Sequence, residues 1–514
     1  MTVFRRLTTA MALCATTAFA QTDGLPDTVV AALEARDFTT ARAALMPLAE
    51  DADNLTAQFR LAALLLQGQG GPRDTDGAVA MLRAAAEAGY APAGLLLGRI
   101  HLTGGSTGVD RDPAQAAAIL DPFATNGNAE AQYYMALLLA HGEGVAQDTD
   151  RALMLLRGAA DQDHTEAQYE LSKVLSRGPD AQDSAQEALK WLTAAASNGH
   201  VEGQYFLALA FDMGNGVQMD KPAALDWYRR AAEGGLPIAQ RTLGTKYLTG
   251  QDDTDPNPDE ALRWLTAAAE AGDPGGMMNL AMAYGGTGGV PQNDAAALQW
   301  LQKASDSGLA RATFVLAHYA ETGRGMAADV REAALLYRKA NEQGHADAGT
   351  RLGQLVGQGL LDTHMPPHMA VSWARLAAEN GDDGARNWLM KRADDALRPA
   401  QAAYGHLLLH LDKDAATALP YLTAAAQTGH VASQFEIGTL YATGNGVDLN
   451  YEQAHAWFNI AATSGHAAAT TQRDALGNLM TPDQISAAQD ITRTFFATAS
   501  DRLPANVAKQ RTQP

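Results

Sequence analysis

Apolar and small residues recur every three or four positions along most of this chain, which is the period of an amphipathic helix. A large aliphatic residue, a small residue and a tyrosine return together, as in Leu243-Gly244 with Tyr247 and Ile437-Gly438 with Tyr441. We expect the small residue to let a second helix approach closely. Each such helix should end at a left-handed glycine, and the candidates are Gly142, Gly214, Gly250, Gly323 and Gly444.

This helical pattern repeats about every 36 residues. Turn glycines mark the period at Gly89, Gly127, Gly199, Gly235, Gly272, Gly308, Gly344, Gly381, Gly429 and Gly465, with Asp163 midway in the one double interval. Four residues after each turn comes a small residue, often followed by Gln and an aromatic, as in Ala167-Gln168-Tyr169. Extrapolation to Ala57-Gln58-Phe59 predicts about eleven two-helix units that begin near Leu55.

The second helix of each unit has a start signal with the same period. Its expected N-cap residues are Asp74, Asp112, Asp148, Ser184, Asp220, Asn257, Asn293, Asp329, Asp414 and Asn450, and only Pro366 breaks the series. Seven residues after most of these positions stands a large aromatic, at Trp191, Trp227, Trp264, Trp300, Trp373, Tyr421 and Trp457. We interpret this aromatic column as packing between helices rather than as a ligand platform.

The combination of Leu-Gly-x-x-Tyr, Gly-x-Gly-Val, an Asp or Asn cap, Ala-x-x-Trp and Gly-His resembles the Sel-one-like repeat, a relative of the tetratricopeptide repeat. The segment from Gln434 to Gly465 carries nearly all of it, and the resemblance extends over residues 55–470. It implies an all-α fold, an α/α solenoid of helix hairpins stacked in a right-handed superhelix. It also implies scaffolding or regulation of other proteins in the bacterial envelope. A cysteine-rich branch is associated with penicillin binding, but its paired cysteines are absent here.

The regular units predict the domain organisation. Residues 1–20 form a signal peptide, residues 21–54 an N-terminal helical cap, residues 55–470 the solenoid, and residues 471–514 a capping helix with a flexible tail. The interval from Gly381 to Gly429 is 48 residues, so the solenoid should be irregular at 382–428. There we expect an extra helix or a truncated unit at Ala385 to Arg398, followed by a first helix that restarts at Ala400.

The amino end has the pattern of a secretory signal. A basic pair, Arg5-Arg6, precedes a short apolar run that closes on Ala18-Phe19-Ala20, and cleavage after Ala20 would leave Gln21 first. The alternatives are a membrane anchor, for which the run is too short, a lipoprotein signal and a twin-arginine signal. Since Cys14 is the only cysteine, the exported chain would contain no disulfide. We therefore expect a periplasmic protein.

Charge restricts the classes of partner. The formal net charge is −20, with 38 Lys and Arg against 58 Asp and Glu, and only 6% of residues are aromatic. An acidic surface repels phosphate backbones and anionic lipids, which argues against nucleic acid and membrane binding. A protein partner with basic or mixed-charge segments suits this surface better.

Candidate chemistry is sparse. Gly104-Gly105-Ser106-Thr107-Gly108 matches a nucleophile-elbow pattern, but it lies in a predicted helix-to-helix loop. Asp252-Asp253-Thr254-Asp255 begins like a calcium loop, yet Pro258 and Trp264 replace residues that such a loop needs. The turn histidines His164, His200, His345, His430 and His466 belong to the repeat pattern. His406 and His410 lie four apart on a predicted helix and could share a Zn²⁺ ion, although the sequence specifies no third ligand.

These observations favour a non-enzymatic protein-binding scaffold, adaptor or regulator in the cell envelope. We assign no catalytic, cofactor-binding or metal-binding residue and expect no cofactor. Two alternatives remain: a cell-wall or β-lactam enzyme of the penicillin-binding type, and a metal or small-molecule carrier that uses His406 and His410.

Overall fold

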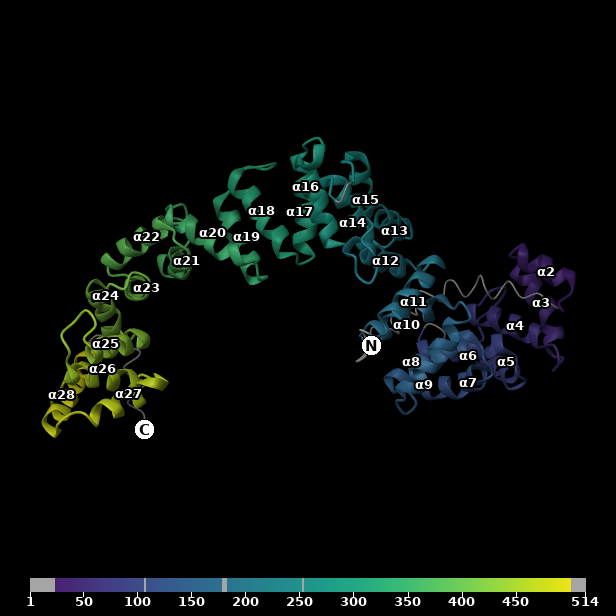
Figure 1. The fold of residues 1–514 in the computed structure, drawn as a ribbon, viewed down its shortest axis with the longest axis horizontal. Coiled ribbons are helices and arrows are strands. Elements are labelled where there is room, and N and C mark those ends of the chain that lie inside the picture. Colours follow the sequence, from purple (N-terminus) through teal and green to yellow (C-terminus); the bar gives the residue numbers. More distant parts are fainter. Residues whose placement is uncertain (1–23, 106–107, 178–182, 252–253, 501–514) are drawn as a thin grey trace. The chain divides into compact units, whose positions relative to one another are not determined.

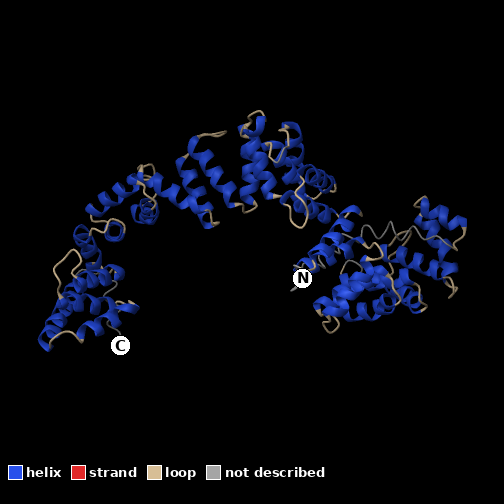
Figure 2. Cartoon of the chain, viewed as in Figure 1, coloured by secondary structure: helices blue, strands red, loops and turns tan. Residues whose placement is uncertain are grey.

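The computed structural model describes residues 24–105, 108–177, 183–251 and 254–500. Within these ranges all regular structure is helical: 27 α-helices, one short 3₁₀-helix and no strand (Figure 2). The all-α solenoid predicted from the sequence is confirmed, because consecutive helices pair and pack against their sequence neighbours.

Eleven helix pairs account for most of the chain (Figure 1). The first helices are α4 (Leu55–Gln67), α6 (Ala91–Thr103), α8 (Ala129–His141), α10 (Thr165–Arg177), α12 (Val201–Met213), α14 (Pro237–Thr249), α16 (Pro274–Tyr284), α18 (Ala310–Thr322), α20 (Ala346–Gly357), α23 (Arg398–His410) and α25 (Val431–Thr443). The second helices are α5 (Thr75–Glu87), α7 (Pro113–Thr125), α9 (Thr149–Ala160), α11 (Ala185–Ser197), α13 (Lys221–Glu233), α15 (Pro258–Glu270), α17 (Asp294–Asp306), α19 (Val330–Glu342), α21 (Pro367–Glu379), α24 (Ala415–Gln427) and α26 (Tyr451–Thr463). The remaining elements are α2 (Asp27–Glu34), α3 (Phe38–Ala49), η1 (Thr287–Gly289), α22 (Asp383–Asp394), α27 (Ala467–Gly477) and α28 (Pro482–Ser500).

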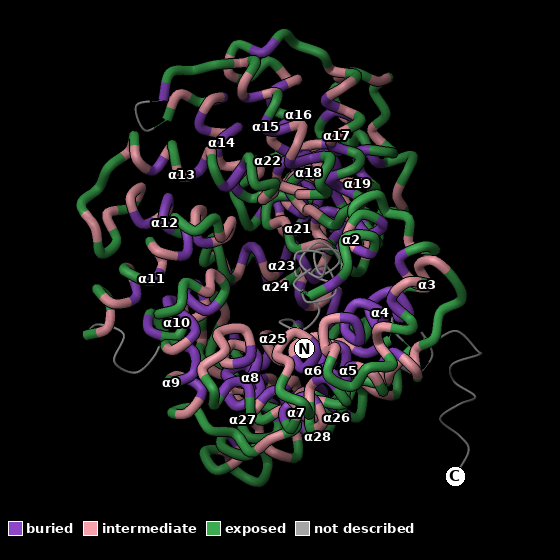
Figure 3. Tube along the Cα trace, turned by 90° about the vertical axis from the view of Figure 1, so that its right-hand side faces the viewer, coloured by how far each residue is buried: buried purple, intermediate pink, exposed green. Residues whose placement is uncertain are grey.

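The helices group into two compact units, residues 1–243 and residues 244–514, with the division inside α14. In each unit the second helix of one pair packs against the first helix of the next pair, as α9 does against α10 and α24 against α25. Buried residues concentrate on the helices, whereas the loops between them are mostly exposed (Figure 3).

Nine of the ten expected N-caps of second helices form side-chain hydrogen bonds. Asp220, for instance, accepts a hydrogen bond from the backbone N–H of Ala223 at 2.9 Å. Ser184 is the exception and corrects the sequence prediction. Its φ of −88° and ψ of 0° are near-helical, whereas a capping residue is extended, so its hydroxyl makes no capping bond.

The Gly-x-Gly loop between paired helices has a steric cause. Its first glycine ends the first helix in the predicted left-handed conformation, as Gly142 does with φ +66°. The second glycine lies against the preceding repeat: a Cβ on Gly144 would lie 2.3 Å from the carbonyl carbon of Pro113. A larger residue there would push the loop away from α7, so this glycine allows successive repeats to make contact.

The close approach of paired helices also follows the prediction. A Cβ on Gly438 of α25 would lie 2.7 Å from the Phe458 ring of α26, and one on Gly98 of α6 would lie 2.6 Å from Leu120 of α7. The small residue of the first helix therefore makes room for a large one on the second.

The side chains of the aromatic column are less buried than the sequence predicted. Trp191 and Trp264 are buried, but Trp227, Trp300, Trp373 and Trp457 are only half-buried. The next position is deeper in most pairs: Tyr228 is 1% exposed and Leu265 is fully buried. In several repeats a cation covers the tryptophan ring, as Arg230 does for Trp227 at 4.5 Å. The column thus lies at the edge of the helix interface.

The irregular stretch contains one extra helix. α22 lies between the pair α20–α21 and the pair α23–α24 and packs against α20, α21 and α23. The loop from α23 to α24 covers only residues 411–414 and lacks the Gly-x-Gly sequence. Among the described residues, no helix combines the length and apolar character that crossing a membrane requires.

We predict that Tyr228→Ala lowers the free energy of unfolding of the first unit by about 3–5 kcal/mol, the cost of removing a large buried aromatic. Urea unfolding monitored by circular dichroism measures the change. Trp227→Ala is the matched control. It should cost clearly less, because part of the Trp227 ring remains exposed in the native state. A larger loss for Trp227→Ala would contradict the assigned depth of the two positions.

Candidate functional site

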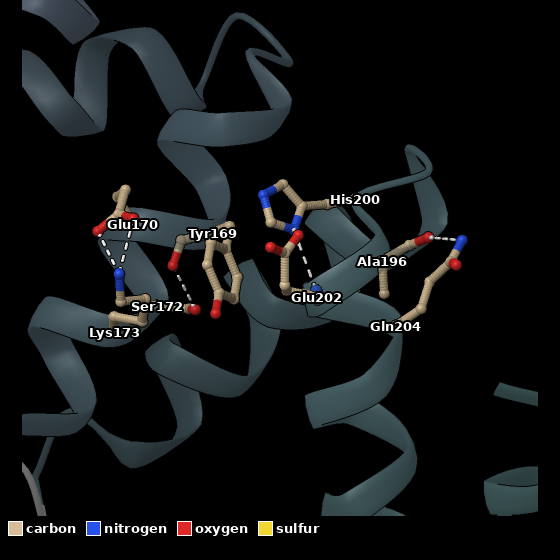
Figure 4. A network of polar contacts seen from close by, with 9 residues as sticks. Tyr169, Glu170, Ser172, Lys173, Ala196, His200, Glu202 and Gln204 are labelled. Atoms are coloured by element: carbon tan, nitrogen blue, oxygen red, sulfur yellow. Dashed lines mark hydrogen bonds and ion pairs between the residues drawn. The ribbon is translucent and has the colours of Figure 1, made fainter. Parts of the chain in front are cut away.

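Aromatic and histidine rings stack at the junctions between repeats. The aromatic of one first helix lies against the histidine that precedes the next first helix. The ring centroids are 4.9 Å apart for Tyr133–His164, 4.1 Å for Tyr169–His200, 4.2 Å for Phe314–His345 and 4.1 Å for Phe435–His466. Figure 4 shows the junction at Tyr169 and His200, where His200 Nδ1 also accepts the backbone N–H of Gly203 at 3.0 Å. These histidines therefore join neighbouring repeats, and His164 and His200 also cap the helix that follows them.

The glutamine of the repeat joins the same junction. Gln204 Nε2 donates to the carbonyl of Ala196 at 3.2 Å, and Gln168, Gln240 and Gln434 bond the corresponding carbonyls of Ala160, Ala232 and Ala426 (Figure 4). Each accepting carbonyl lies in the last turn of the preceding helix, where backbone acceptors have no partner inside the helix. The Gln-aromatic pair and the turn histidine are thus structural residues.

Ion pairs also link successive repeats, with partners 30 or 31 positions apart. They are Arg99–Glu130, Asp121–Arg151, Arg157–Glu187, Asp294–Arg324, Glu321–Arg351 and Asp362–Arg392. Most are partly exposed, so each contributes little to stability. Glu321–Arg351 is the least exposed of these pairs. Burial alone would raise the pKa of Glu321, but hydrogen bonds from Arg351 and Tyr337 outweigh the effect of burial and lower that pKa.

In the first unit, large apolar side chains are exposed on two successive first helices. Val174 of α10 is 48% exposed, and Phe206 and Met213 of α12 are 43% and 59% exposed. The Phe206 ring lies 6.2 Å from the ring of Tyr169, which stacks on His200. We call Val174, Phe206 and Met213 the apolar ridge. Because the stacked rings below hold Phe206 in place, the ridge is a candidate contact surface for another protein.

The second unit contains an open groove of about 720 Å³ between α21, α23 and the start of α25. Its polar lining consists mainly of His368, Arg375, Arg398, His406 and His430. This local surface is basic, in contrast to the acidic chain as a whole.

The two histidines singled out from the sequence come together with a glutamate at one side of this groove. His406 Nδ1 and His410 Nε2 lie 3.0 and 2.8 Å from the same oxygen, Oε1 of Glu436 on α25. Burial alone would raise the pKa of Glu436. The hydrogen bonds from both histidines outweigh this effect, so the pKa lies below its usual range. The other oxygen, Oε2, is buried without a hydrogen-bond partner.

His430 differs from the other turn histidines. Its stacking partner would follow the repeat glutamine, here Gln401, but that position holds Ala402. The His430 ring instead meets His406 edge-on, with centroids 5.8 Å apart. His430 Nδ1 lies 2.9 Å from Ser433 Oγ and accepts the Ser433 backbone N–H at 3.3 Å. Burial lowers the pKa of His430, and the neighbouring His406 lowers it further.

Within the described residues, the remaining sequence candidates form no site. Ser106 and Thr107 of the elbow pattern and Asp252 and Asp253 of the acidic loop lie outside the described residues. Trp264, which occupies the glutamate position of a calcium loop, is 5% exposed and packs between helices.

Glu436 is the residue that sequence reasoning missed. It stands 30 positions after His406, which is the separation that links ion-paired residues of successive repeats elsewhere in the chain. Searching for acidic residues one such interval after the histidine pair would have found it.

A sequence model of the Sel1 repeat matches the chain ten times, at residues 55–90, 92–128, 129–164, 165–200, 201–236, 237–273, 274–309, 310–345, 346–382 and 431–466. The chain belongs to the Sel1 repeat family. The unmatched interval of this Sel1 repeat protein, residues 383–430, contains α22 and the pair α23–α24.

Known proteins resemble parts or most of the chain. Chitin synthase regulatory factor 3 of Schizosaccharomyces pombe is 30% identical over 241 residues, which are 45% of this chain and 24% of that protein. The uncharacterized protein NMB1327 of Neisseria meningitidis is 28% identical over 232 residues, 45% of each chain. The chain thus spans less than half the length of these relatives. The crystal structure of c5321, a protective antigen of uropathogenic Escherichia coli with an SLR fold, aligns with a TM-score of 0.58. It is 25% identical, and the alignment covers 92% of this chain and 97% of that one.

We predict that acidification weakens the junction at His200. Burial lowers the pKa of His200, despite the opposing carboxylates of Glu202, Glu166 and Glu170. As the pH falls, His200 is therefore protonated in the unfolded chain before it is protonated in the folded one. The stability that neutral His200 gives the junction is lost as the pH falls below about 6.5 toward the lowered pKa. Hydrogen exchange at the start of α12, measured at pH 7.5 and pH 5, should show faster opening at the lower pH after correction for intrinsic exchange.

His200→Asn is the matched variant. Asparagine does not titrate, and Asn128 already caps α8 at the corresponding position by accepting the Ala131 N–H at 2.9 Å. The variant should lose most of the local pH dependence. An undiminished response would place its origin in another group.

Proposed function

We propose that this Sel1 repeat protein is a non-enzymatic scaffold or regulator that binds another protein in the bacterial cell envelope. The apolar ridge carries the proposal: two successive repeats expose Val174, Phe206 and Met213, and Phe206 lies beside the stacked ring of Tyr169. Exposed apolar side chains on helices rather than on loops suit recognition of a protein segment.

The family supports the protein-binding part of this proposal. Sel1 repeats form scaffolds for protein interaction, and one similar protein is named as a regulatory factor of chitin synthase. The junction residues also support it: the turn histidines and glutamines that would be candidates for chemistry are occupied in joining repeats. Within the described ranges, the polar residues therefore serve mainly the architecture.

The envelope location and the charge of the partner are the finer parts of the proposal. The location rests on the basic pair, apolar run and Ala18-Phe19-Ala20 of the first 20 residues. After removal of that segment the chain would have a net charge of −22. A partner segment with basic or mixed charge would be attracted to it.

We predict that the exported protein begins at Gln21. Signal cleavage should follow the A-x-A sequence, so amino-terminal sequencing of protein from the periplasmic fraction should give Gln-Thr-Asp-Gly. An Ala18→Leu variant, which places a large residue in the cleavage site, should accumulate uncleaved. Detection of Met1, or of a lipid on Cys14, would contradict the proposed location.

We predict that Phe206→Ser weakens binding of the envelope partner by about tenfold or more, the effect of removing a central apolar anchor. The partner would first be captured from envelope extract with the wild-type chain and identified by mass spectrometry. Surface-plasmon kinetics with the purified partner would then compare variants. Met154→Ser is the control, because Met154 is 62% exposed on a second helix and lies outside the apolar ridge.

The same kinetics test the charge of the partner. Raising the salt from about 50 to about 500 mM should slow association more than it speeds dissociation, since salt screens long-range attraction. Equal binding by Phe206→Ser and the wild type would overturn the role of the ridge. A salt-independent association rate would overturn the charge complementarity alone.

A further inference from the structure

The strongest unexplained cluster in the described chain is formed by His406, His410 and Glu436. It lies wholly within the second unit, apart from the apolar ridge of the first. We infer that these three residues bind a divalent transition-metal ion of the Zn²⁺ type.

The geometry of the three donor atoms favours a metal. One nitrogen from each ring and one oxygen of Glu436 lie within 4.8 Å of one another. In a tetrahedral site with bonds of about 2.0–2.1 Å, ligand atoms are separated by roughly 3.3 Å. The two ring nitrogens lie 3.0 and 2.8 Å from Glu436 Oε1, only a few tenths of an ångström less. Small rotations of the side chains would therefore admit the ion without moving the helices.

Backbone spacing holds the ligands in place. His406 and His410 are separated by one turn of α23, so their side chains lie on the same face of that helix, and their rings are nearly parallel with centroids 5.9 Å apart. Glu436 comes from α25, the next first helix. Since two ligands come from one rigid helix and the third from its neighbour, the ion would join two successive repeats.

A simple hydrogen-bonded cluster explains the contacts less well. Both histidines point at one carboxylate oxygen, while the second oxygen, Oε2, is buried with no partner. A carboxylate that served only as a hydrogen-bond acceptor would be better satisfied if both oxygens were used. Two ring nitrogens gathered at one carboxylate oxygen, with the second oxygen unused, supply the ligand atoms that a cation requires.

The surroundings select the type of ion and leave one position for solvent. Two imidazoles and one carboxylate suit Zn²⁺ and similar ions, whereas Ca²⁺ and Mg²⁺ prefer sites made of oxygen. The His410 side chain is 59% exposed, so water can reach the cluster and act as a fourth ligand. His430 lines the groove but is not a ligand, because its Nδ1 caps α25 by accepting the backbone N–H of Ser433.

The test is zinc titration of the full chain, prepared without a polyhistidine tag and stripped of metal by a chelator. Isothermal titration calorimetry with zinc chloride at pH 7.5 should show one specific equivalent, and calcium chloride should show none. His406→Ala, His410→Ala and Glu436→Gln should each weaken zinc binding by about 100-fold or more, exceeding the loss caused by changing an outer-shell partner.

His368→Ala is the matched control, since His368 is an exposed histidine of the same groove that does not converge on Glu436. It should bind zinc as the wild type does. Circular dichroism melting of each metal-free variant checks that the fold is intact, and zinc should raise the melting temperature of the wild type and His368→Ala only. Absence of zinc binding by the wild type, or binding by His406→Ala or His410→Ala that is as tight as that of the wild type, would overturn the inference.

Discussion

The junction between successive repeats is the constraint on which the rest of the structure depends. A single helix pair cannot bury its apolar surface, so each pair is stable only against its neighbours. Three short-range features define that contact: a ring stack such as Tyr169 on His200, a glutamine bond to the preceding helix, and a loop glycine such as Gly144 against the helix before it. Each uses residues of adjacent repeats only. The same junction can therefore be repeated without any long-range contact.

This division of roles decides which residues remain available for function. Alanines and leucines fill the interior, while Gln, His and Gly of the repeat are committed to the junctions. One position of the first helices is not fixed in this way and varies in chemistry: it holds Phe206 on α12, Arg351 on α20, where it pairs with Glu321, and Glu436 on α25. Specific recognition should therefore arise from these positions, where a substitution leaves the solenoid intact.

The sequence predicted the architecture well because the signals for helix starts and stops are local. The aspartate and asparagine caps and the left-handed glycines form as expected, since each depends on a few neighbouring residues. The errors concern how deeply a side chain is buried and which residues of another repeat it contacts. Trp227 is half-buried because the preceding first helix packs against the next residue, Tyr228, and no local pattern distinguishes the two. Glu436 was missed for a related reason: its partners belong to another repeat.

The polar cluster occurs where the repeat loses its regularity, and the two facts are connected. An extra helix, a loop shortened to residues 411–414 and Ala402 in place of an aromatic all fall within one interval. Loss of the aromatic removes the stacking partner of His430, whose ring turns to His406 instead. A regular junction would have filled this space with a stacked pair. Departures from local consistency in natural proteins tend to mark functional positions. Here the departure opens a basic groove and places two histidines beside a carboxylate, so the irregular repeat is the one that acquires chemistry of its own.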